Sequence, residues 1–202
     1  MADLATQFPV DLGFAATNFN TVTPALVTET NSGKIRRAGF GHSYYTWEAQ
    51  FPTLTFDQAK RIQGFLAQAA GQIFSFEIVM PLLSSSAAAS PTSTLNHGAA
   101  SAGARSVSVT GTNNAQVIKA GDFFKFSGHT KVYQATADLT LSAGGTGTLN
   151  FSGGLVQAVT TGTIARDGFA WTACVDEDTQ EVSYGVGGIS GLSVKMREVW
   201  GT

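Results

Sequence analysis

Short β-like runs, several of them alternating between apolar and polar residues and many followed by Gly, Pro or Ser, recur along this chain. The run at 72–80 places Phe74, Phe76, Ile78 and Met80 on one side, and Pro81 follows it directly. Alternation with a period of two is typical of strands that bury one face. Further short β runs lie at 34–38, 43–51, 107–109, 122–126, 131–135, 138–141, 147–151 and 168–175. The last of these is expected to form a hairpin with 181–185 across the polar turn 176–180. The sequence therefore predicts a mainly β fold.

One segment, 56–70, has the period of an α-helix instead. Thr55 is placed to cap its first turn, and Gln58 stands three residues later as the second half of a capping box. Gly71 provides a left-handed stop. The apolar residues on one face of this helix are Ala59, Ile62, Phe65, Leu66 and Ala69. We expect one helix that buries a single stripe.

The chain divides into segments of different composition. Residues 82–104 are rich in Ser, Ala, Pro, Thr and Gly with almost no charge, which predicts a linker or an extended arm. Residues 105–165 contain short β runs separated by Gly, Asn and Ser, which is typical of a small barrel or sandwich. A closing strand at 191–199 is expected to pair with the first segment. The predicted organisation is one β domain, 1–81 and 166–202, with the module 105–165 inserted into it.

The surface composition favours assembly. Charged residues make up 13% of the chain and Gly occupies 23 positions, so the surface must consist largely of small uncharged side chains that suit contact with copies or neighbours. The net charge of -2 creates no strong field, so neither nucleic acid nor an anionic membrane is expected as a partner. The chain shows no signal peptide and no apolar run long enough to span a membrane, so we expect it to be made in the cytoplasm.

Known patterns of catalysis and metal binding are not found in the sequence. His42, His97 and His129 lack the spacing of a zinc site, and Asp176-Glu177-Asp178 fits a solvated turn better than a calcium loop. The single cysteine, Cys174, lies within an apolar run, so we expect a buried thiol. Neither a Gly-x-Ser-x-Gly elbow nor a phosphate-binding glycine loop occurs. We therefore expect no enzyme activity, no cofactor and no metal.

Basic residues form the densest cluster of charge. Lys34, Arg36 and Arg37 lie close together, and Lys60 and Arg61 lie on the predicted helix. Two interpretations remain open, a solvated face or a contact with an acidic surface on a neighbouring subunit. These five residues are the candidate subunit-interface residues.

Three stretches together resemble the distal-tail and tail-hub proteins of tailed bacteriophages. The first is Ile35-Arg36-Arg37, Tyr44-Tyr45-Thr46-Trp47-Glu48, the helix and Gly71-Gln72-Ile73-Phe74-Ser75-Phe76, which resembles the ring-forming N-terminal domain of that family. The second, similar to the family's inserted β module, is Ile118-Lys119-Ala120-Gly121-Asp122-Phe123-Phe124-Lys125-Phe126, Val132–Asp138 and Gly147–Phe151. The proline usual after its last strand is absent here. The third is Leu192–Val199, which is like the family's closing strand.

The resemblance implies a structural subunit of the virion tail. Such a subunit forms a homo-oligomeric ring, commonly a hexamer, that joins the tail tube to the tail tip or fibres. The implied partners are further copies of the chain, the tail tube protein, the tail tip or central fibre protein, and the tape-measure protein. The alternative is a carbohydrate- or receptor-binding β module of a virion, for which Tyr44, Tyr45 and Trp47 are the candidate aromatics.

Overall fold

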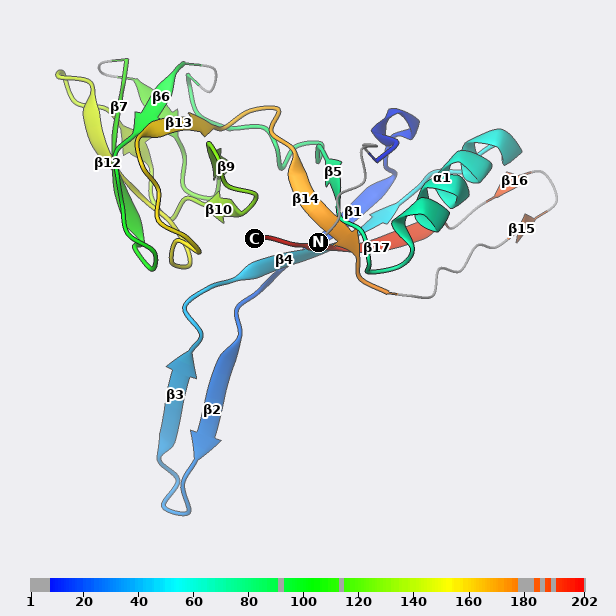
Figure 1. Cartoon of the computed structure of the whole chain (residues 1–202), viewed down its shortest axis with the longest axis horizontal. Helices are drawn as coiled ribbons and strands as arrows, with labels where there is room; N and C mark the ends of the chain where they lie inside the picture. Colours follow the sequence, from blue (N-terminus) through cyan, green and yellow to red (C-terminus); the bar gives the residue numbers. More distant parts are fainter. Residues whose placement is uncertain are drawn as a thin grey trace.

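A computed structural model describes residues 8–90, 93–112, 115–177, 184–185, 188–189 and 192–201 of the chain. The fold of these residues is mainly β with one α-helix, as expected from the sequence. Two larger sheets lie side by side, and a two-stranded hairpin projects away from both (Figure 1). No helix in the described ranges is both long and apolar enough to cross a membrane.

The first sheet joins strands from the beginning and the end of the chain. Its order is β1-β4-β17-β14-β5, and its strands are β1 (Ala16–Val22), β4 (Tyr44–Gln50), β17 (Ser193–Glu198), β14 (Trp171–Val175) and β5 (Phe76–Ile78). Strand β17 pairs antiparallel with β4, with Met196 opposite Trp47. This pairing confirms that the closing strand returns to the first segment. We expected a hairpin partner for β14 at 181–185, but the described partners of β14 are β17 and β5.

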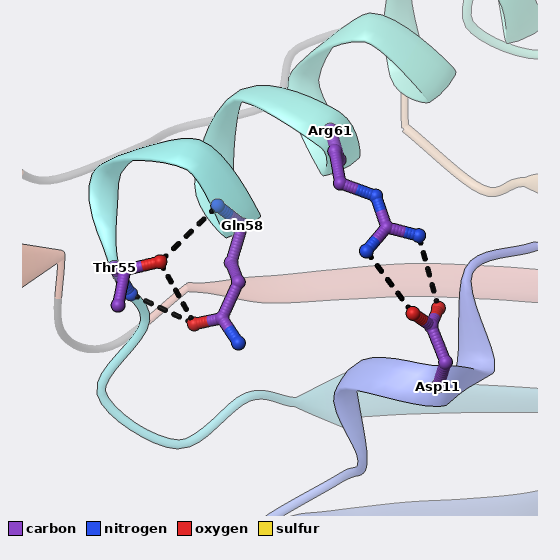
Figure 2. Close-up of polar contacts among 4 residues, drawn as sticks. All are labelled: Asp11, Thr55, Gln58 and Arg61. Atoms are coloured by element: carbon purple, nitrogen blue, oxygen red, sulfur yellow. Dashed lines mark hydrogen bonds and ion pairs between the residues drawn. The ribbon is translucent and has the colours of Figure 1, made fainter.

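The helix α1 (Phe56–Ala69) packs its apolar stripe into the core of this sheet. Its buried residues belong to the same hydrophobic cluster as Trp47, Trp171 and Phe76, and the Phe65 and Phe76 rings meet edge to face at 4.9 Å. The predicted capping box is confirmed: the Thr55 hydroxyl accepts from the Gln58 backbone, and the Gln58 side chain accepts from Thr55 N (Figure 2). The helix ends one residue before the predicted boundary, with Ala70 in the left-handed region. A short 3-10 helix, η1 (Val10–Leu12), precedes β1.

The second sheet and its neighbouring strand pair enclose a core of their own. The order is β10-β9-β13-β6-β7-β12, and a separate pair is β11-β8. The strands are β6 (Leu95–His97), β7 (Ser106–Gly111), β8 (Gln116–Ile118), β9 (Phe123–Phe126), β10 (Val132–Gln134), β11 (Leu139–Thr140), β12 (Thr146–Asn150) and β13 (Gly162–Ala165). Phe123 and Val132 belong to the core of the first sheet, so the two sheets are packed together.

The stretch 82–104, expected as a linker or arm, contributes a strand to the second sheet. Within it, β6 pairs with β7 and β13, and Leu95 and His97 are buried. The charged side chains of two other residues hold the segment before β6 in place. Asp122 accepts from the Ala87 and Lys119 backbones, and Arg166 donates to Ser90 and Val117 carbonyl oxygens.

The remaining strands form two-stranded sheets. They are β2 (Ala25–Glu29) with β3 (Ile35–Gly39), and β15 (Tyr184–Gly185) with β16 (Gly188–Ile189). Part of the predicted acidic turn, 178–180, and residues 181–183 of the expected partner strand lie outside the described residues.

Candidate subunit interface

The β2–β3 hairpin, residues 25–39, extends the β1–β4 pair beyond the body of the protein (Figure 1). Its strands pair antiparallel, with Leu26 opposite Ala38 and Val27 opposite Arg37. The turn is closed by Thr30 N donating to Lys34 O at 3.0 Å and Gly33 N donating to Thr30 O at 2.8 Å. Gly33 has a φ of +75°, a conformation that favours glycine. Local hydrogen bonds therefore form this hairpin without help from either core.

Apolar side chains on the β2–β3 hairpin remain open to solvent. All residues of β2 and β3 are exposed, including Leu26 and Val27, each 59% accessible, and Ile35 at 50%. Phe40, at the base, is 63% accessible. Because successive side chains of a strand point to opposite faces, Leu26 and Val27 give both faces of the hairpin apolar character. An isolated two-stranded ribbon is marginally stable in water, so a surface of this kind is suited to being covered by a partner.

The charge of the β2–β3 hairpin is opposite to that of the rest of the chain. Lys34, Arg36 and Arg37 against Glu29 give the hairpin +3 − 1 = +2, so the remaining residues carry −2 − 2 = −4. None of the ion pairs found among the described residues involves the hairpin. Its cations are therefore available to an acidic surface on another molecule.

The other two candidate residues lie elsewhere, on α1. The Arg61 guanidinium donates to both carboxylate oxygens of Asp11, at 3.0 and 3.3 Å (Figure 2). The Lys60 ammonium lies 4.4 Å from the centre of the Phe56 ring. The structure thus separates the five candidates into a hairpin group without ion pairs and a helix group engaged in contacts within the chain.

The five-stranded sheet has two edges with different protection. At one edge, β1 contains no charged residue and no proline, although such residues are common guards against pairing with other chains. At the other edge, the backbone N–H of Phe8 donates to the backbone oxygen of Glu77 in β5 at 3.0 Å. The chain at Phe8 therefore covers part of this edge. The β1 edge is therefore open to an added strand.

A buried ion pair that the sequence analysis missed joins the two sheets. The Lys131 ammonium contacts the Glu198 carboxylate, with side chains 4% and 0% accessible, and Val132 N donates to Glu198 Oε1 at 2.8 Å. Burial raises the pKa of Glu198 and lowers that of Lys131. The ammonium also lies 4.5 Å from the ring centres of Tyr45 and Trp200. With both charges enclosed, this pair links β17 of the first sheet to the residue that precedes β10 of the second.

The histidines occupy separate places. His42 is exposed, with Nδ1 3.1 Å from Phe40 O; His97 is buried on β6; and His129 is buried with Nδ1 3.5 Å from the Tyr133 hydroxyl. Across the described ranges, no group of three His, Cys, Asp or Glu residues could hold a metal ion. Cys174 is buried as expected, and burial raises the pKa of its thiol.

Comparison with known proteins leaves the family open. No family model matches the chain, and neither does any curated protein.

Proposed function

We propose that this protein is a structural subunit of a bacteriophage tail, which forms a ring that joins the tail tube to the tail tip or fibres. The β domain made of 1–81 and 166–202 would form the ring, and the module 105–165, a small barrel or sandwich, would be carried on it. The partners are further copies of the chain, commonly six in a ring, together with the tail tube protein, the tip or central fibre protein and the tape-measure protein. The site of action is the virion tail.

The β2–β3 hairpin is the observation that carries this proposal. Its turn is closed by its own hydrogen bonds, it exposes apolar side chains on both faces, and its net charge is opposite to that of the body. A projecting element of one protomer that docks on a different surface of the next makes a heterologous contact, and such contacts form a ring where the rotation between protomers closes. The open β1 edge and the low charged fraction of 13% support the same arrangement, because both favour association with copies of the chain.

The proposal is tested by the mass of the purified chain in solution. We expect light scattering coupled to size exclusion to give a multiple of 21.1 kDa, and negative-stain images to contain rings. Changing Leu26 and Val27 to Asp should yield a monomer with unchanged circular dichroism, because both side chains are exposed. The matched control is Leu82→Asn, which removes a leucine that is 87% exposed outside the hairpin and leaves a residue that tolerates the φ of +67° there. A monomeric wild-type chain, or rings that persist in the hairpin variant, would contradict the proposal.

A further inference from the structure

A cleft lies where the two sheets meet. On one side are Thr172 of β14 and the segment after β17, including Trp200; on the other are the turn 128–130 and Gln157. Its volume is about 230 Å³, below the ~300–1,000 Å³ of pockets for drug-sized ligands. Clefts between packed units of a chain are common places for small-molecule sites.

The lining of the cleft is uncharged. It contains no Asp, Glu, Lys or Arg, and its single titratable side chain is that of His129. His129 is 6% accessible, and burial lowers the pKa of its imidazole, which favours the neutral form. The nearest buried cation, Lys131, is matched by Glu198. An ionic ligand would find no countercharge here, because a charge that loses its hydration needs a partner.

Trp200 provides a fixed aromatic wall. Its ring lies 6.2 Å from the Tyr44 ring and 5.9 Å from the His42 ring, with the Lys131 ammonium 4.5 Å from its centre. The other two tryptophans are 2% and 0% accessible in the core of the first sheet. Trp200 is half-buried, so its indole is the one whose surroundings a ligand in the cleft would change.

Neutral hydrogen-bonding groups complete the lining. Thr130 and Thr172 supply hydroxyls, each able to donate and to accept, and Ser75 lies beside them. The Gln157 amide donates to Gly128 O at 3.4 Å, which holds it at the cleft. The cleft therefore offers hydroxyls, an amide and an indole, and none of these groups is charged. Such a lining suits a ligand that is itself neutral and rich in hydroxyls. We propose that this cleft binds a neutral pyranose sugar, one ring at a time.

The inference does not depend on ring assembly, and it is tested on the full chain. Intrinsic fluorescence is recorded while methyl glycosides of glucose, galactose, mannose and N-acetylglucosamine are added. We expect a saturable change with at least one glycoside and a dissociation constant of about 1 mM, as suits a small ligand with few contacts. The methyl glycoside of glucuronic acid should bind at least tenfold more weakly. No saturable change with any neutral glycoside, or equal binding of the anionic one, would overturn the proposal.

Variants assign the signal to the cleft. Thr130→Val and Thr172→Val each remove one hydroxyl with little change in shape, and each should weaken binding about tenfold as measured by calorimetry. Thr148→Val is the matched control, an exposed threonine on β12 outside the cleft. Trp200→Phe should abolish the fluorescence change. Full affinity in both cleft variants would overturn the assignment, and this result would leave the oligomeric state, and hence the proposed function, untouched.

Discussion

At the scale of single residues, the most consequential side chains are Lys131 and Glu198, whose charges are enclosed between the sheets. Taking two charges out of water is costly, and their attraction offsets this cost only while both are present. We therefore infer that the pair contributes to the relative position of the two sheets and adds little net stability. Its members are 67 positions apart in the sequence, so no local pattern pairs them.

Removing one partner should be far more damaging than removing both charges. We expect Lys131→Met to lower the free energy of unfolding by about 3–5 kcal/mol, because it leaves a buried carboxylate unpaired. Combining it with Glu198→Gln removes both charges and keeps an acceptor for Val132 N, so the double variant should recover most of the loss. Urea unfolding of the wild type, both single variants and the double variant measures the coupling. Strictly additive losses would contradict this account.

The loss of stability in Lys131→Met should also depend on pH. Burial already raises the pKa of Glu198 above its ordinary value of 4.5, and loss of the Lys131 charge should raise it further. A carboxyl with a raised pKa in the folded state favours folding at low pH, and this contribution is lost as pH rises through the folded pKa. The stability deficit of Lys131→Met should therefore be smallest below about pH 4.5 and should grow toward neutrality. Unfolding curves over this range check the sign, and a deficit that shrinks with rising pH would refute it.

At the scale of elements, Arg166 explains how a segment with the composition of a linker is held against the second sheet. Its side chain is buried and donates to the carbonyl oxygens of Ser90, Ser93 and Val117. Arg166→Met would leave these acceptors unpaired, and each buried loss is worth about 1–3 kcal/mol. We expect destabilisation of at least about 3 kcal/mol and faster protease cleavage within 82–94. Arg105→Met, at an exposed arginine, is the control, and equal cleavage in both variants would show that Arg166 does not hold the segment.

A buried face made several elements predictable, although β3, whose residues are all exposed, was also predicted, at 34–38. The alternation of Tyr45, Trp47 and Ala49 located β4, and Thr55 with Gln58 located the start of α1. Strand β2 was not predicted; all its residues are exposed, so no buried face marks it in the sequence. Strand β6 was not predicted because its three residues lie in a Ser- and Ala-rich segment and pair with strands that are distant in the sequence.

The candidate interface was predictable only in part. Charge density alone pointed to Lys34, Arg36 and Arg37, which the structure places on one projecting hairpin. The same criterion grouped Arg61 with them, yet Arg61 pairs with Asp11, 50 positions away. Which cations are free depends on tertiary contacts, and local sequence does not contain these.

At the scale of the whole molecule, the separation of charge between the β2–β3 hairpin and the body has a consequence for assembly. The hairpin carries +2 and the rest of the chain −4. If the hairpin of one protomer docks on the body of the next, attraction between them should speed and strengthen association at low ionic strength. Salt screens exposed charges over about 8–10 Å at physiological concentrations, so the proposed rings should dissociate more readily as salt is added.

Reversing the charge of the β2–β3 hairpin should remove this dependence. Arg36→Glu with Arg37→Glu changes the hairpin from +2 to −2 without touching either core, because both side chains are exposed. We expect unchanged unfolding curves, weaker assembly by sedimentation velocity at low salt, and partial recovery at high salt where repulsion is screened. The matched control, Arg105→Glu with Lys119→Glu, makes the same change in net charge at exposed positions of the 105–165 module. If both pairs shift the sedimentation profile equally, net charge rather than hairpin docking governs association; if only the hairpin pair does, the contact is local to β2 and β3.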